Sequence, residues 1–293
     1  MRLRLLTLLV LTLAACPAAA VDDEDTSAIT ERLLLEETLA DNRFAIVPHR
    51  PTYILPLTYV DNPNEAPYEG TDVDLESLEA KYQISLKIPL AKGLLGGRER
   101  LYFGYTQLSL WQLYNRQTSA SFRETVYEPE VLLTFLHNRE VFGFRSRVLS
   151  IGLNHQSNGQ SGLLSRSWNR IVAQLILERG DLYLSLRPWL RIPESEKKSP
   201  ADPTGDDNPD IEKYMGNFEF RAVLRNGDAH WGLMLRNNLR DENRGAVELD
   251  YSRPLGNQVR AYVQYFNGYG ESLIDYDHYN SRIGIGIMLT DWL

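Results

Sequence analysis

The stretch that decides the fold runs Val148-Leu149-Ser150-Ile151-Gly152-Leu153-Asn154-His155-Gln156-Ser157-Asn158-Gly159. Its odd positions 149, 151 and 153 are apolar, whereas its even positions 150, 152 and 154 carry Ser, Gly and Asn. Side chains of a β-strand alternate between two faces, so this pattern predicts a strand with one apolar and one polar face. In a membrane barrel the apolar face contacts lipid and the polar face lines the lumen. His155 and Ser157 continue the odd set, and we expect both on the lipid side.

A second alternating stretch begins near Trp168. Its odd positions from 169 to 177 hold Asn, Ile, Ala, Leu and Leu, while its even positions from 170 to 178 hold Arg, Val, Gln, Ile and Glu. Asn169 therefore belongs to the apolar, outward set. A loop from Asn158 to Ser167 joins the two predicted strands, so the pattern brings together a hydroxyl, an imidazole and a side-chain amide.

The same alternation extends from about Tyr82 to the end of the chain, and residues 61–78 are typical of a long polar loop. Segments of about ten residues separated by polar or glycine turns are typical of a membrane barrel, as are aromatic girdles. The pattern accommodates about ten to twelve strands, and because such barrels have an even number we expect twelve. The predicted fold is an all-β, twelve-stranded antiparallel transmembrane β-barrel. The alternative is a soluble, secreted β-sandwich or barrel.

The N-terminus is typical of an exported protein. Basic residues and a short apolar run precede Ala18-Ala19-Ala20, which predicts a signal peptide over residues 1–20. A lipoprotein-type box that would leave a lipidated Cys16 is the alternative. Residues 21–45 form an acidic N-terminal extension, either a short helix or a mobile segment, and a solvated terminus is the favoured interpretation. Residues 46–293 are assigned to the barrel.

Composition excludes several classes of protein. Cys16 is the only cysteine, so no disulfide holds the fold together. Removing residues 1–20 takes away Arg2 and Arg4 and no acid, and the formal net charge moves from −8 to −10. An acidic chain argues against nucleic acid as a partner. After the signal no apolar run is long enough for a transmembrane helix.

The three converging groups suit nucleophilic catalysis. A serine hydroxyl is a weak nucleophile and needs a base within hydrogen-bonding reach, which His155 can supply. A third group must fix the imidazole tautomer, and Asn169 can accept from one ring N–H. A neutral orienting group suits a site near hydrocarbon, where a buried carboxylate is costly. The alternative is that His155 and Ser157 are a polar strand end at the membrane interface.

Longer motifs resemble a known family. The segments 154–161 (NHQSNGQS) and 165–170 (SRSWNR) resemble the signature of the outer-membrane phospholipases A of Gram-negative bacteria. Further likeness lies in 122–125 (FRET), 206–210 (DDNPD), 213–216 (KYMG) and 268–276 (GYGESLIDY). The resemblance covers most of residues 80–293. It implies a twelve-stranded barrel in the bacterial outer membrane that hydrolyses sn-1 and sn-2 acyl esters of phospholipids and lysophospholipids. It also assigns the nucleophile to Ser157, the base to His155 and the orienting amide to Asn169.

The resemblance further implies a calcium cofactor at the site of oxyanion formation. Its ligands would be the hydroxyl of Ser165, the main-chain carbonyl of Gln160, and a carbonyl of Ser119 of the partner subunit. The family usually has Arg at the position of Gln160, and a carbonyl ligand survives that change. A second calcium position in the monomer would use Asp207, but Gly162 stands where its other acid would be, so that position is in doubt. The alternative for Asp207 is a solvated loop.

Gln107 is polar on an otherwise apolar strand face, where polar groups are costly and usually functional. In the family such a glutamine hydrogen-bonds across a homodimer interface, which implies that dimerisation completes the calcium site and switches activity on. The alternative is that Gln107 faces the lumen. The competing functions are a non-enzymatic pore or structural barrel, and another outer-membrane hydrolase such as a lipid A deacylase or a protease.

Overall fold

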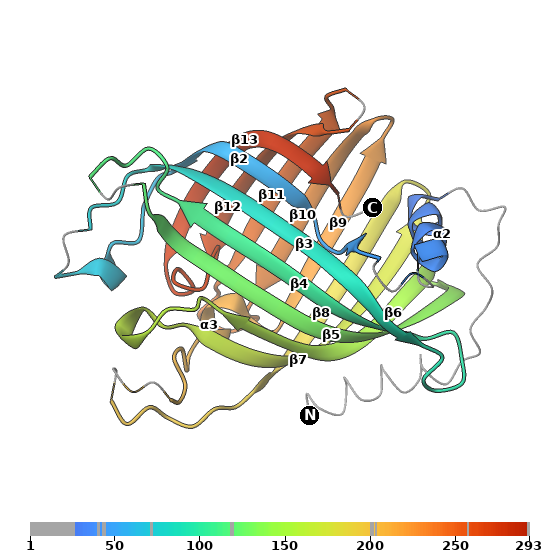
Figure 1. The fold of residues 1–293 in the computed structure, drawn as a ribbon, viewed down its shortest axis with the longest axis horizontal. Helices are drawn as coiled ribbons and strands as arrows, with labels where there is room; N and C mark the ends of the chain where they lie inside the picture. The colour runs from blue at the N-terminus through green and yellow to red at the C-terminus, as the bar shows by residue number, and fades with distance from the viewer. Residues whose placement is uncertain are drawn as a thin grey trace.

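The chain folds into a closed β-barrel. The computed structural model describes residues 27–39, 42, 45–70, 73–117, 120–199, 202, 204–256 and 258–291. Twelve antiparallel strands, β2 to β13, pair in sequence order, and the pairing of β13 with β2 closes the sheet (Figure 1). This confirms the predicted fold. The strands are β2 (Thr52–Val60), β3 (Leu78–Lys92), β4 (Arg100–Trp111), β5 (Phe122–Val141), β6 (Phe144–Ser157), β7 (Ser167–Arg179), β8 (Leu182–Ile192), β9 (Phe218–Asn226), β10 (Ala229–Asn237), β11 (Gly245–Pro254), β12 (Arg260–Tyr269) and β13 (Tyr279–Thr290).

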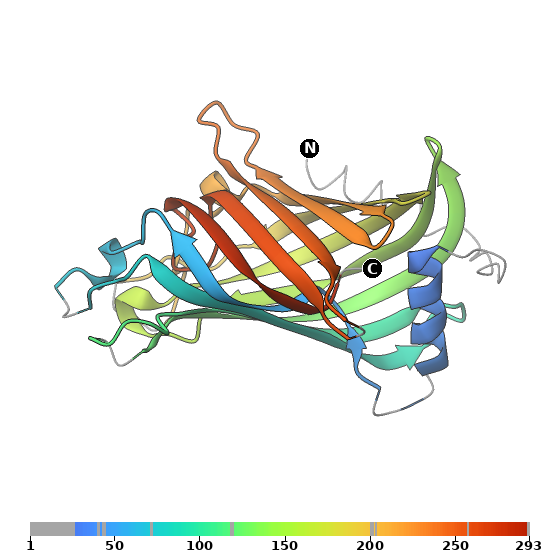
Figure 2. The same cartoon turned by 90° about the horizontal axis from the view of Figure 1, so that it is seen from above.

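The two ends of the barrel differ in the length of their connections. Tight turns at residues 142–143, 180–181 and 227–228 close one end, whereas long segments such as 193–217 and 270–278 gather at the other (Figure 2). The long connections carry the short helices η1 (Ala66–Tyr68), η2 (Gly162–Leu164) and α3 (Glu212–Met215). In outer-membrane barrels the longer loops are extracellular. The long-loop end is therefore the outer end of this barrel.

One strand escapes the sequence pattern. The alternation begins near Tyr82, but the structure adds β2, within the segment assigned to the barrel. Pro56 lies inside β2, and the register with β3 shifts between Leu55 and Thr58. Proline cannot donate to the sheet, and a bulge moves side chains from one face to the other. The period of two is broken there, which hides the strand.

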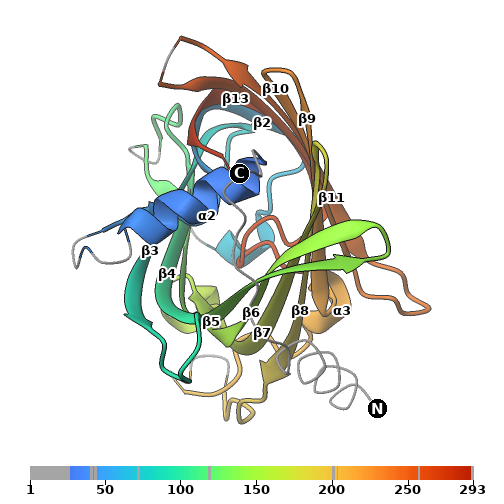
Figure 3. The ribbon, with the colours of Figure 1, turned by 90° about the vertical axis from the view of Figure 1, so that its right-hand side faces the viewer.

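Helix α2 (Ala28–Leu39) crosses the mouth at the short-turn end (Figure 3). Glu36 is buried and lies 2.8 Å from the ammonium of Lys87 and 3.2 Å from Arg32. Burial raises the pKa of Glu36, but Lys87 and Arg32 outweigh it and lower that pKa to about 2. The favoured solvated terminus is therefore wrong for these residues, because lumen groups give the helix specific partners. The predicted signal peptide and Cys16 lie outside the described residues. No helix in the described part of the chain is long and apolar enough to cross a membrane.

The distribution of polar and apolar side chains is the reverse of that in a soluble protein. The lumen holds buried ion pairs: Arg123 lies 2.7 Å from Glu79 and 2.9 Å from Asp275, and Lys81 lies 2.9 Å from Glu271. The outer surface instead exposes large apolar side chains, including Ile54, Leu57, Val131, Leu153, Leu224, Leu249, Ile283, Ile285 and Leu289. Large exposed apolar surface marks contact with an apolar partner, and around a closed barrel that partner is lipid.

Candidate active site

The three predicted catalytic residues lie at the long-loop end of two neighbouring strands. In the register of β6 with β7, His155 pairs with Asn169 and Ser157 pairs with Ser167. Nδ1 of His155 lies 2.8 Å from Oδ1 of Asn169. Because Oδ1 can only accept, Nδ1 carries the proton and donates it. The other ring nitrogen, Nε2, then has its lone pair free to act as a base.

Ser157 ends β6, two residues after His155 and on the same face. Its hydroxyl makes no hydrogen bond in the described part of the chain. The imidazole of His155 can still reach it, since alternate residues of a strand lie about 7 Å apart along the chain. Contacts of this kind are often long in an unliganded enzyme and shorten when substrate binds.

The site faces outward, toward lipid. Leu153, on the same face of β6, is 59% exposed. The intervening residues point the other way: Asn154 donates to Glu128 at 2.8 Å, and Gln156 accepts from the buried Trp168 at 2.7 Å. A molecule that lies in the lipid can therefore approach the hydroxyl sideways, without entering the lumen.

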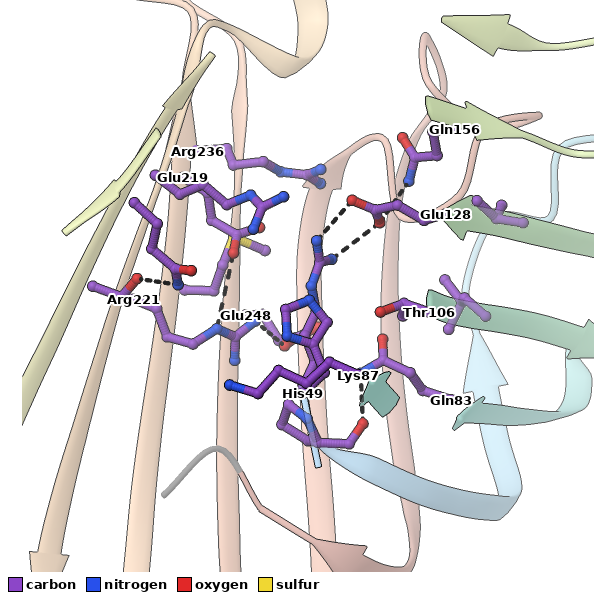
Figure 4. Close-up of a pocket in the computed structure, with 18 of the residues that line it drawn as sticks. His49, Gln83, Lys87, Thr106, Glu128, Gln156, Glu219, Arg221, Arg236 and Glu248 are labelled. Carbon is purple, nitrogen blue, oxygen red and sulfur yellow. Dashed lines mark hydrogen bonds and ion pairs between the residues drawn. The ribbon is translucent and has the colours of Figure 1, made fainter. Parts of the chain in front are cut away.

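The lumen beside the site is a different environment. A cavity of about 220 Å³ there is lined by charged side chains. Figure 4 shows Gln156 beside Glu128, with Arg221 between Glu219 and Glu248 on the opposite wall. Arg221 lies 3.5 Å from Glu248 and 4.0 Å from Glu219, so its positive charge is balanced within the cavity.

One contact of the site was missed from sequence. Nδ2 of Asn169 donates to Oε1 of Glu194 at 3.1 Å. Glu194 lies just beyond β8, and Asn169 pairs with Ile192 in the register of β7 with β8. Glu194 is two residues past Ile192, on the same side, so the register would have revealed it. Without the register, 25 residues of separation conceal the pair.

The residues assigned to calcium are partly brought together. Ser165 Oγ donates to Asp207 Oδ2 at 2.9 Å, and Ser167 Oγ donates to the same oxygen at 3.1 Å. The main-chain carbonyl of Gln160 belongs to the same loop and accepts from no described group. Hydroxyl, carbonyl and carboxylate oxygens are the donors that calcium prefers. These residues therefore fit a calcium site that is completed by further ligands.

The second calcium position fits less well. Asp207 also forms an ion pair with Lys197, which sequence analysis did not anticipate. Gly162 has a φ of +64°, a conformation that an acid at that position would adopt only with strain. In the described part of the chain no three His, Cys, Asp or Glu side chains cluster as a metal site. Ser119 lies outside the described residues.

Gln107 lies on the outer face of β4. Its neighbour Thr106 faces the lumen and pairs with Ser85 at 2.7 Å, so Gln107 points away from the lumen. Its amide contacts the hydroxyls of Tyr105 at 3.1 Å and Tyr82 at 3.4 Å.

Three register pairs place Gln107, Tyr127, Ser157 and Ser167 in one row across β4 to β7. Two strand spacings, about 10 Å, thus separate Gln107 from the candidate nucleophile.

Several known proteins are similar to this chain in sequence and in fold. The family model for phospholipase A1 matches residues 29–289. A phospholipase A1 of Klebsiella pneumoniae is 38% identical over 253 residues, which cover 86% of this chain and 84% of that protein. The outer membrane phospholipase A of Escherichia coli is 37% identical, covers 86% of this chain and 95% of its own, and has a TM-score of 0.79. The Salmonella typhi outer membrane phospholipase, solved as a dimer with bound calcium, is 36% identical, with 86% and 94% coverage and a TM-score of 0.79. The outward Ser157, His155 and Asn169 thus stand on the barrel of these enzymes, and this chain belongs to the phospholipase A1 family.

Proposed function

We propose that this protein hydrolyses sn-1 and sn-2 acyl esters of phospholipids and lysophospholipids, with Ser157 as nucleophile, His155 as general base and Asn169 as the orienting residue. The observation that carries the proposal is the 2.8 Å contact between Nδ1 of His155 and Oδ1 of Asn169. It fixes the imidazole tautomer on the same outward face as the Ser157 hydroxyl, which has no hydrogen-bond partner among the described residues. The barrel lies in the bacterial outer membrane, so this face meets the substrate directly.

The residues define the order of proton transfers. His155 Nε2 removes the proton of Ser157 as the oxygen attacks the ester carbonyl. The imidazolium then gives that proton to the departing alcohol of the lipid, which leaves an acyl group on Ser157. Water, deprotonated by His155, releases the fatty acid and restores the serine. Asn169 holds the imidazole in one orientation through both halves of the reaction.

Calcium, when bound, supplies positive charge where the carbonyl oxygen becomes negative. The Salmonella typhi relative was solved with bound calcium. Ser165 and the carbonyl of Gln160 are the residues of this chain that would hold the ion. Both lie in the loop that follows Ser157, between β6 and β7.

Dimerisation is the proposed switch. The Salmonella typhi relative is a dimer. A dimer across the outer face of β4 would bury the amide of Gln107 against a second copy. The calcium ligand expected from the partner subunit, Ser119, lies outside the described residues. The proposed regulation is that the monomer is silent and the dimer active.

The deciding experiment measures fatty-acid release from mixed phospholipid–detergent micelles. Wild type is compared with Ser157→Ala and with Ser199→Ala, an exposed serine in the loop after β8. Each is assayed with calcium and with EDTA. We expect calcium-dependent release by wild type and Ser199→Ala, and loss of at least about 1,000-fold in Ser157→Ala.

Two results would contradict the proposal. Release that survives in Ser157→Ala would exclude the assigned nucleophile. Absence of release by folded, dimeric wild type, together with ion conductance in planar bilayers, would favour a pore.

A further inference from the structure

The orientation of the Asn169 amide needs a cause. The oxygen and nitrogen of a side-chain amide are nearly equal in size, so hydrogen bonds alone decide which atom faces the imidazole. If the amide turned over, Nδ2 would face His155. Nδ1 could then only accept, and the proton would move to Nε2. In that tautomer Nε2 cannot take the proton of Ser157.

Glu194 meets the other side of this amide. Its Oε1 accepts from Nδ2 of Asn169 at 3.1 Å. A carboxylate has no proton to donate, so it contacts favourably only the nitrogen of the amide. Asn169 thus lies between a group that donates, His155, and a group that accepts, Glu194.

Glu194 is itself held in place. It follows the end of β8, where Ile192 is paired in the sheet with Asn169. Beyond it the loop closes on itself, since the amide N–H of Asp206 donates to the carbonyl of Ser195 at 2.8 Å. The side chain of Asp206 in turn pairs with Arg191 of β8. The backbone on both sides of Glu194 is therefore anchored.

The charge of Glu194 is tolerated at this position. The side chain is half-buried and lies at the extracellular end of the barrel, beyond the last residue of β8. Water can solvate its second oxygen there, which avoids the cost of burying a carboxylate in hydrocarbon. A full charge can thus stand behind a neutral residue that itself faces lipid.

We propose that Glu194 is a positioning residue that holds the Asn169 amide with its oxygen toward His155, and so selects the imidazole tautomer that the reaction needs. The proposal rests on the proposed Ser157-His155-Asn169 mechanism. It assigns to the segment after β8 an indirect part in catalysis, exerted through Asn169.

The test is a double-mutant cycle on full-length protein in phospholipid micelles. Glu194→Ala should lower kcat roughly tenfold and leave KM unchanged, because the lost group acts on the reacting geometry and does not bind substrate. Glu194→Gln should lower kcat by less than Glu194→Ala, since its amide oxygen can still accept from Asn169, although its amide nitrogen can also donate to a turned-over Asn169 amide. Glu196→Ala, an exposed acid two residues on, is the matched control and should equal wild type. In an Asn169→Ala background Glu194→Ala should cost nothing further.

Each other result overturns the assignment. An unaffected Glu194→Ala means that Asn169 needs no support. An equal loss in the Asn169→Ala background means that Glu194 acts elsewhere, and a loss confined to KM means that it binds substrate. A Glu194→Gln variant as impaired as Glu194→Ala makes the charge, and not the accepted hydrogen bond, responsible. The catalytic proposal is tested separately by Ser157→Ala, whose failure to inactivate would remove the basis for Glu194 as well.

Discussion

The two faces of one short segment, residues 154–157, differ in how many partners hold their side chains. Toward the lumen, Asn154 contacts Glu128 at 2.8 Å, Glu130 at 3.2 Å and Arg170 at 2.6 Å. Toward lipid, His155 has a single side-chain partner, Asn169, and Ser157 has none in the described part of the chain. Groups held from several sides stabilise the barrel. Groups held from one side remain open to substrate.

This difference follows from what each face contacts. Inside the barrel an unpaired polar group is buried and costs free energy, so a lumen residue such as Asn154 is stabilised by several partners. On the outer face, next to lipid, polar residues are expensive and persist only for a function. We therefore expect substitutions at adjacent residues to have different effects. Those on the outer face should lower activity, and those on the inner face should lower stability.

The largest effect is expected from a pair of adjacent residues. His155→Ala should lower fatty-acid release by at least about 1,000-fold, because Ser157 loses its base, and should leave unfolding unchanged. Gln156→Ala should keep most activity but lower the free energy of unfolding by about 1–3 kcal/mol, since the buried indole N–H of Trp168 loses its acceptor. Release assays and urea unfolding followed by tryptophan fluorescence measure the two effects. Equal loss of stability in both variants would contradict the division between a catalytic outer face and a stabilising inner face.

A second adjacent pair tests the same division on β7. Asn169→Ala should lower kcat by about 100-fold, because the imidazole loses its orientation, with little change in unfolding. Arg170→Met should instead lower the free energy of unfolding by about 3 kcal/mol, because its guanidinium is buried and contacts Asn154 and Glu128. Activity of the folded fraction of Arg170→Met should stay within a few-fold of wild type. A folded but inactive Arg170→Met would show that the lumen network also shapes the active site.

The fold and the centre of the site were predictable because alternation is a local signal. In residues 148–157 odd and even positions lie on opposite faces of the strand. The outward placement of His155, Ser157 and Asn169 can therefore be predicted without information from the rest of the chain. The row that joins Gln107 to Ser157 was not predictable in this way. It depends on the registers of two strand pairs, which turns and bulges set.

The parts that sequence missed depend on contacts between segments that are far apart in the chain. Glu194 and Lys197 lie in a segment without periodicity, so nothing local marks their partners. Helix α2 was taken for a solvated terminus, because Glu36 reaches Lys87 and Tyr102 only in the finished barrel. Pro56 concealed β2 through a bulge. In each case the deciding contact is distant in sequence.

Gln107, on the outer face of β4, tests the proposed dimer. Gln107→Leu should weaken self-association by about tenfold, since each of two symmetric copies loses a hydrogen bond in an apolar setting. Activity should fall at low protein-to-detergent ratio and recover at high ratio. Cross-linking against protein concentration measures this, with Trp231→Leu on β10, half-way around the barrel, as the control. Loss of activity at every concentration would instead place Gln107 in the chemistry.

The smallest expected effect concerns the calcium loop. Lys197 pairs with Asp207, whose carboxylate also accepts from Ser165, the proposed calcium ligand. Lys197→Ala removes a positive charge from this position, so the local potential becomes more negative and favours a cation. The calcium concentration for half-maximal activity should therefore fall about threefold. Lys198→Ala, exposed and adjacent, should leave it unchanged. A rise in the calcium requirement of Lys197→Ala would mean that Lys197 serves to anchor the loop, and that Asp207 without it no longer holds Ser165 in place.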